Sequence, residues 1–195
     1  MRIVQILGSG RNCGKTTLGC AILAAFPTLR WIAVKVTPHS HSIDATLTGK
    51  DTDRFHRAGA AESHLLPAPI TPASFHSFVG RADAVLVESG QPLAGLRWRL
   101  LRLAIAPADA SLWKPGFAER RMHVDALILT GSGAVASDAI LQPAARPFTA
   151  QPCTSRPFTA QPFAEQLPLV FHASDAATLP SALHACIADF LNGKT

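Results

Sequence analysis

The sequence predicts an α/β fold, in which a mostly parallel sheet is covered by helices on both faces. Short, unbroken runs of Val, Ile and Leu alternate with longer stretches whose apolar residues recur at helical spacing. Unbroken apolar runs are typical of strands buried on both faces, as in parallel sheets. The 195 residues are 48% hydrophobic and only 16% charged, which is an ordinary globular composition. We therefore expect a single domain over residues 1–195.

The apolar runs define the expected strands, and the stretches between them define the expected helices. A helix over Thr16–Phe26 has an apolar face, because Leu18 and Ile22 lie one turn apart. A helix over Asp51–Ala61 opens with acids, which suit the positive end of a helix. The other expected helices are Pro72–Val79, Pro115–Met122 and Leu179–Leu191. The expected strands are Arg2–Leu7, Trp31–Val36, Ser63–Leu66, Ala84–Val87, Leu101–Ile105, Ala126–Leu129 and Leu169–Phe171.

Two segments do not follow this alternation. Residues 37–50 are polar and rich in turn formers, so we expect a loop after the second strand. Residues 142–168 hold a short repeat, in which the heptapeptide of 146–152 recurs at 156–162. Its prolines exclude a helix and a central strand. We expect 142–168 to be an extended, mobile insertion, either a surface loop or a cover over a ligand.

Charge and hydropathy narrow the location and the partners. No apolar run approaches the roughly 20 residues that span a membrane, and the N-terminus begins directly with an apolar strand, so we expect a cytoplasmic protein. A net charge of +5 favours anionic partners. The basic residues are scattered, which argues against nucleic acid and favours phosphorylated small molecules or an acidic protein surface. The four cysteines have no CxxC spacing, so we expect free thiols.

The sequence GSGRNCGKTT, residues 8–17, is the strongest functional signal in the chain. It follows an apolar strand and opens an amphipathic helix, which is the setting of a P-loop, the phosphate-binding turn of nucleoside triphosphatases. The backbone N–H groups of such a turn surround phosphate oxygens. We expect Lys15 to bridge the β- and γ-phosphates, Thr16 to bind Mg²⁺ and Thr17 to approach the α-phosphate. The other expected nucleotide contacts are Gly10, Arg11, Asn12, Cys13 and Gly14.

A carboxylate is expected beside this turn, because the metal on a P-loop needs an acidic partner at the end of a neighbouring strand. Glu88 directly follows an apolar strand, and we expect it to hold the metal and to act in catalysis with Lys15. Asp51 is either a second carboxylate near Mg²⁺ or the N-cap of a helix. Ser9 stands where the usual spacing has glycine, so the first turn is expected to be built differently.

The segments around the second strand extend this pattern. Residues 34–41 read VKVTPHSH, and residues 49–60 read GKDTDRFHRAGA. With GKTT and the strand end VLVE, residues 1–90 resemble the molybdopterin-guanine dinucleotide biosynthesis protein B family (MobB). In this family a strand ending in Lys, Thr and His precedes a Gly-Lys-Asp element and a helix that runs into Ala-Gly-Ala. Two positions differ: Pro38 interrupts a His-rich run, and Ser89 stands where the family tends to have glycine.

The resemblance implies a GTP-binding protein with Mg²⁺ and weak GTPase activity. Such a protein assists attachment of GMP to molybdopterin, acts with the partner transferase MobA, and is often a homodimer. The positions that match the family are Gly14, Lys15, Thr16, Thr17, Lys35, Thr37, His39, Lys50, Asp51 and Glu88. Lys35 thus joins the expected nucleotide-binding residues, as a cation suited to a phosphate. Apart from Arg11, no arginine finger or water-positioning glutamine stands out, which suits slow hydrolysis.

The same residues leave other functions open. GTP over ATP rests on the resemblance alone, and dethiobiotin synthetase has a similar P-loop and Val-Glu strand end, so an ATP-dependent small-molecule kinase or ligase is one alternative. His39 and His41 are residues that could bind Zn or Ni in a nucleotide-dependent metallochaperone, although loop histidines are commonly solvent-exposed. A regulatory nucleotide sensor without turnover is a third. Asp175 follows the last strand and could contact the base or cap the final helix.

Overall fold

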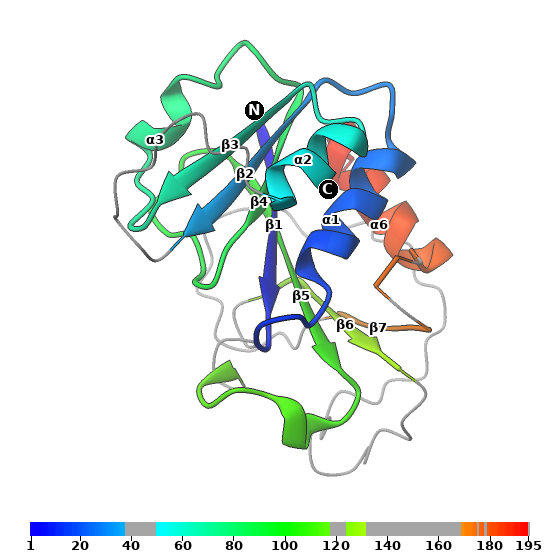
Figure 1. Cartoon of the computed structure of the whole chain (residues 1–195). Helices are drawn as coiled ribbons and strands as arrows, with labels where there is room; N and C mark the ends of the chain where they lie inside the picture. The colour runs from blue at the N-terminus through cyan, green and yellow to red at the C-terminus, as the bar shows by residue number, and fades with distance from the viewer. Residues whose placement is uncertain (38–49, 118–123, 132–168, 175, 178, 195) are drawn as a thin grey trace.

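The computed structural model describes residues 1–37, 50–117, 124–131, 169–174, 176–177 and 179–194 (Figure 1). Several predictions from the sequence fall outside these residues. They concern His39 and His41 of the first polar loop, the repeat in 142–168, Cys153 and Asp175. The backbone of Lys50 is described, but its side chain is not.

The described strands form one seven-stranded sheet in which every pairing is parallel. The order across the sheet is β3-β2-β4-β1-β5-β6-β7, so β1 lies between β4 and β5 at its centre. The strands are β1 (Arg2–Gly8), β2 (Trp31–Thr37), β3 (Glu62–Pro67), β4 (Ala84–Glu88), β5 (Arg99–Pro107), β6 (Ala126–Thr130) and β7 (Leu169–Ala173). Each contains one of the expected strands, which confirms the α/β class with a parallel sheet.

The helices agree with the sequence less closely. They are α1 (Lys15–Ala25), α2 (Lys50–Arg57), α3 (Ala73–His76), the 3₁₀ helix η1 (Ala110–Leu112) and α6 (Ser181–Asn192). The expectation of a helix over Asp51–Ala61 was too long, because Gly59 adopts a φ of 109° and the N–H of Ala60 returns to the carbonyl of Phe55. The helix expected over Pro72–Val79 was also too long, since only Ala73–His76 is helical. Much of Pro115–Met122 lies outside the described residues.

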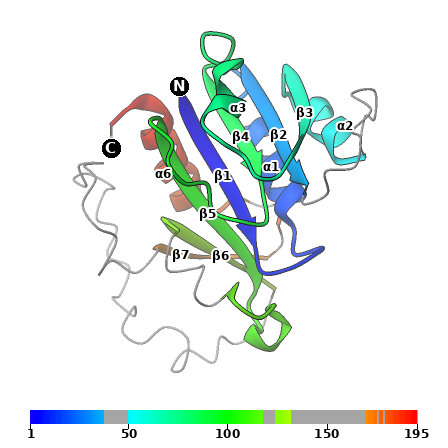
Figure 2. The same cartoon turned by 90° about the vertical axis from the view of Figure 1, so that its left-hand side faces the viewer.

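Helices cover both faces of the sheet, as the sequence predicts. On one face α1, α2 and α6 pack against alternate strand residues such as Val4, Ile6 and Leu86. On the other face α3 packs against residues such as Ile3 and Val85, as Figure 2 shows from the side of α3. Because successive strand residues point to opposite faces, a residue's position along its strand decides which set of helices it meets. In the part of the chain that the structure describes, no helix is both long and apolar enough to cross a membrane.

Candidate functional site

The connection between β1 and α1, residues 9–14, is a glycine-rich loop at the C-terminal end of the central strand. Gly14 adopts a φ of 98°, and its carbonyl accepts from the N–H of Leu18 at 2.8 Å, which starts α1. A Cβ atom on Gly14 would lie 2.5 Å from the Cβ of Ala176, so both space and backbone conformation require glycine there. Asn12, with a φ of 57°, also has a left-handed conformation, which Asn tolerates better than most residues. The loop therefore turns sharply before the N-terminus of α1.

Ser9, the departure from the usual spacing, is buried and held through its backbone. Its N–H donates to the carbonyl of Ile105 on β5 at 3.1 Å, and its carbonyl accepts from the N–H of Lys114 at 3.0 Å. Ser9 is only 1% exposed. The loop thus begins as an extension of the β1–β5 pairing, which does not need a glycine at this position.

Lys15 lies at the first position of α1 and reaches back into the loop. Its Nζ donates to the carbonyl of Gly10 at 2.7 Å and lies 3.6 Å from Sγ of Cys13. A Cβ on Gly8 would lie 2.8 Å from carbons of the Lys15 side chain, so the absence of a side chain at Gly8 leaves room for the lysine. The ammonium group therefore lies among the residues predicted to surround phosphate.

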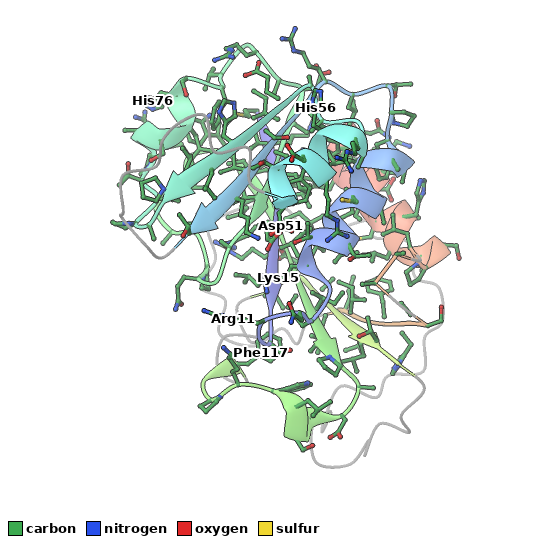
Figure 3. The ribbon with its side chains drawn as sticks, in the orientation of Figure 1. Arg11, Lys15, Asp51, His56, His76 and Phe117 are labelled. Atoms are coloured by element: carbon green, nitrogen blue, oxygen red, sulfur yellow. The ribbon has the colours of Figure 1, made fainter. Side chains whose placement is uncertain are left out.

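Lys35 and Glu88 are register partners in the paired strands β2 and β4. They follow Ala33 and Leu86 at a spacing of two, and those residues belong to the core under α1 and α2. Lys35 and Glu88 are therefore expected on the face of the sheet that α1 and α2 cover. Figure 3 shows Lys15 and Asp51 at the ends of these two helices.

An ion-pair cluster, formed by Lys35, Asp51, Arg54 and Glu88, joins the two strands to α2. Lys35 is hydrogen-bonded to Asp51 through Nζ–Oδ2, and its Nζ lies 3.5 Å from Oε1 of Glu88. Asp51 also meets Arg54, with 3.9 Å between Oδ1 and a guanidinium nitrogen. The side chain of Glu88 is only 6% exposed. A buried carboxylate needs partners of this kind, because an unpaired charge is costly away from water.

Two hydroxyl groups of α1 connect the cluster to the glycine-rich loop. Oγ1 of Thr16 donates to Oε2 of Glu88 at 2.7 Å. Oγ1 of Thr17 accepts from the guanidinium of Arg54 at 3.1 Å. The structure thus brings together Lys15, Thr16, Thr17, Lys35, Asp51 and Glu88, all of which the sequence predicted as site residues. Their proximity follows from the adjacency of β1, β4 and β2, which the sequence alone does not specify.

Arg54 and Lys114 belong to this neighbourhood but escaped prediction. A signal for Arg54 was present, because it follows Asp51 by three residues on a predicted helix, where side chains share a face. Lys114 carried no comparable signal. It follows η1 and reaches the loop only because β5 pairs with β1.

Ser89, the second departure from the family pattern, lies within a buried polar network on the opposite face of the sheet. Nε2 of Gln5 donates to Oγ of Ser89 at 2.6 Å, and that Oγ donates to the carbonyl of Gln91 at 2.8 Å. Oε1 of Gln5 accepts from the N–H of Leu93 at 3.1 Å. The hydroxyl of Ser89 therefore stabilises the turn after β4 and makes no contact with the ion-pair cluster.

Cys20 lies beneath the cluster, and burial raises the pKa of its thiol above the ordinary value, while the charge of Arg54 opposes this in part. Its Sγ donates to the carbonyl of Arg54 at 3.6 Å. A raised pKa does not suit a nucleophilic cysteine, and the side chain of Cys20 packs against the core under α1.

The carboxylates of the cluster are of the kind that Mg²⁺ takes together with phosphates. Among the described residues no group of three or more His, Cys, Asp or Glu side chains could hold a metal ion by itself. Mg²⁺ does not need such a group, since it is commonly bound by one or two carboxylates together with phosphates and water. Glu88 and Asp51 supply two carboxylates, and the Thr16 hydroxyl contacts the first of them. The predicted His39 and His41 metal site lies outside the described residues.

Comparisons with protein families and with curated proteins assign no relative to this chain. No protein-family model matches it, and no curated protein matches it at a significant level. The resemblance to the MobB family therefore stays a prediction, which rests on the motifs of residues 1–90.

Proposed function

We propose that this chain binds a nucleoside triphosphate with Mg²⁺, holding the phosphates on the glycine-rich loop and the metal beside Thr16 and Glu88. The observation that carries the proposal is the 2.7 Å hydrogen bond between Oγ1 of Thr16 and Oε2 of Glu88. The hydroxyl that follows the loop lysine and the acid that ends the neighbouring strand are the pair that holds Mg²⁺ in P-loop nucleoside triphosphatases. Their contact here connects two motifs that lie 72 positions apart in the chain.

The loop supplies the phosphate contacts. Backbone N–H groups at the N-terminus of α1 carry a partial positive charge that favours phosphate oxygens. Lys15 would exchange the carbonyl of Gly10 for the β- and γ-phosphates, because its Nζ already lies within the loop. A phosphate oxygen is a stronger, charged acceptor than a carbonyl oxygen.

Thr16 and Glu88 would hold Mg²⁺, and Asp51 supplies a further carboxylate on the same side. When bound, the metal neutralises charge on the β- and γ-phosphates. Lys35 balances part of the negative charge of Glu88 and Asp51 in the structure described here, since its ammonium meets both carboxylates. Arg54 donates to the hydroxyl of Thr17, the residue expected to approach the α-phosphate.

We further propose that the nucleotide is GTP, that hydrolysis is slow, and that the protein assists molybdenum-cofactor nucleotide attachment with a MobA-like transferase. The motif order of residues 1–90 supports this role. Slow hydrolysis agrees with the ion-pair cluster, because its arginine, Arg54, already contacts Asp51 and Thr17. A homodimer is part of the same expectation.

Thermal unfolding with Mg²⁺ and GTP, with Mg²⁺ and ATP, and with Mg²⁺ alone tests the proposal, repeated on Lys15→Ala. Ligand at a hundred times its dissociation constant stabilises a protein by about 2.7 kcal/mol, which raises the midpoint by roughly 5–10 °C. We expect that rise with GTP, and no rise in Lys15→Ala. A rise with ATP alone would favour the small-molecule kinase or ligase instead. If neither nucleotide stabilises the native chain, the proposed function is wrong.

A further inference from the structure

A second lysine lies against the glycine-rich loop, on the side opposite the ion-pair cluster. The N–H of Lys114 donates to the carbonyl of Ser9 at 3.0 Å. The Cγ, Cδ and Cε atoms of Lys114 lie 3.5–3.7 Å from the point that a Cβ atom on Gly10 would occupy. The aliphatic part of Lys114 thus runs across Gly10, which is also the residue whose carbonyl accepts from Lys15.

The segment that carries Lys114 is firmly attached to the sheet. Nε1 of Trp113 donates to the carbonyl of Pro107 at the end of β5, at 2.8 Å. The N–H of Phe117 donates to the carbonyl of Lys114 at 3.1 Å. Phe117 is 1% exposed, and its ring meets that of Trp113 edge to face. Figure 3 shows Phe117 beneath Arg11 at the tip of the loop. Lys114 is therefore held in place by its backbone and by its neighbours.

The charge of Lys114 has no partner in the described part of the chain. No ion pair joins it to a described carboxylate, whereas Lys35 and Arg54 on the other side of the loop are both paired. The residue is exposed, as is Arg11. We call Arg11 and Lys114 the basic rim of the loop. Exposed cations beside a phosphate-binding turn are suited to an anion that arrives from solvent.

We propose that Lys114 is a second phosphate-binding lysine, which contacts the β- and γ-phosphates of the nucleotide together with Lys15. This inference rests on the proposed function. The side chain of Lys114 crosses the loop at Gly10, and Gly10 is also the residue that Lys15 contacts. A phosphate that binds Lys15 there would therefore lie near Lys114 as well. Lys114 lies at the loop's N-terminal half, away from Thr17, the residue expected near the α-phosphate. Its contribution should therefore be largest for triphosphates and smallest for monophosphates.

Calorimetric titration with the Mg²⁺ complexes of guanosine and adenosine mono-, di- and triphosphates tests this inference. The variant Lys114→Met keeps the aliphatic chain and the backbone bond to Ser9 but removes the charge. We expect the dissociation constant for the preferred triphosphate to rise about tenfold at low salt, with little change for the monophosphate. Lys114→Arg should bind within about threefold of the native chain, because the charge is retained. The difference should shrink as salt is added.

Lys194→Met is the matched control. Lys194 is also exposed, but it follows α6, where Gly193 lies next to the side chains of Arg2 and Arg99 at the start of β1 and β5. Because the strands are parallel, that is the opposite end of the sheet from the loop. We expect native nucleotide affinity in this variant. If Lys114→Met fails to fold, Lys114→Gln replaces it in the titration, because glutamine also lacks the positive charge.

The outcomes separate the two proposals. If the native chain binds a triphosphate and Lys114→Met binds it equally well, the inference is overturned and the proposed function stands. Equal losses for mono- and triphosphate would also overturn it, since the contact would not be with the β- and γ-phosphates. If the native chain binds no nucleotide, both proposals are wrong.

Discussion

The two sides of the glycine-rich loop differ in how their charges are balanced. On the side of β2, β4 and α2, the cations Lys35 and Arg54 are paired with the carboxylates Asp51 and Glu88. On the side of β5, no ion pair joins the basic rim to a carboxylate of the described residues. The side of β2, β4 and α2 is thus suited to a cation that takes the place of the Lys35 ammonium group. The side of β5 is suited to an anion.

Under the proposed function, this difference would let a single loop separate the metal from the phosphates of a metal–nucleotide complex. A divalent cation needs carboxylates that are already close together, because bringing like charges together costs free energy. Lys35 lies between the two carboxylates and allows them to stay close in the structure described here. Phosphates need donors and positive charge, which the loop and its basic rim provide. The variants below test whether the two sides act separately.

The largest effect is expected from Glu88→Gln. The amide keeps a hydrogen-bonding group for Thr16 but loses the charge that would hold the metal. We expect the affinity for the Mg²⁺ complex of GTP to fall between about 10- and 100-fold, as for other residues around bound metals. Binding measured in EDTA should change little. If Glu88→Gln weakens binding equally with and without Mg²⁺, this side of the loop does not hold the metal.

A smaller effect, on the free protein, is expected from Lys35→Met. Removal of the Lys35 ammonium group leaves the carboxylates of Asp51 and Glu88 close together without the cation that they share. Breaking a fully buried pair costs 3–5 kcal/mol, and because Lys35 and Asp51 are partly exposed we expect about 2 kcal/mol from urea unfolding. Mg²⁺ alone should restore part of this loss, because it can replace the ammonium. Lys114→Met should leave the unfolding free energy unchanged, and an unchanged value in Lys35→Met would contradict the role assigned to Lys35.

The smallest effect is expected from Arg54→Met. Arg54 holds the Thr17 hydroxyl at 3.1 Å, but its side chain is 43% exposed, so solvent screens the interaction. We expect nucleotide affinity to fall about threefold, with similar losses for mono- and triphosphates because Thr17 is expected at the α-phosphate. Arg57→Met, one turn further along α2, is the control and should bind normally. If only the triphosphate lost affinity, Arg54 would act near the β- and γ-phosphates, which would contradict its expected place near the α-phosphate.

The strands could be predicted from the sequence because their signal is local. Runs such as those of β1 and β4 are buried on both faces, so most of their positions are apolar, with Gln5 as the polar residue inside β1. The helix ends were less predictable. The end of α2 depends on Gly59 and on β3 starting at Glu62, so it is set by the sheet rather than by helix propensity.

The candidate site also contains residues whose positions depend on local sequence and residues whose positions depend on the order of the strands. The positions of Lys15 and Thr16 at the start of α1 could be predicted because they follow the loop directly in the chain, and that of Glu88 because it ends an apolar strand. Lys114 could not, since its position depends on β5 lying beside β1. The role of Ser89 was also hidden, because only the structure shows its hydroxyl in the Gln5 network on the opposite face.

The most direct test of nucleotide binding at this loop is a crystal structure of the chain with Mg²⁺ and a non-hydrolysable GTP analogue. We expect the phosphates to lie over residues 10–17, with the Lys15 Nζ moved from the Gly10 carbonyl to a phosphate and with Mg²⁺ on the Thr16 hydroxyl. A nucleotide bound elsewhere, or one whose phosphates leave Lys15 on Gly10, would contradict the proposed function.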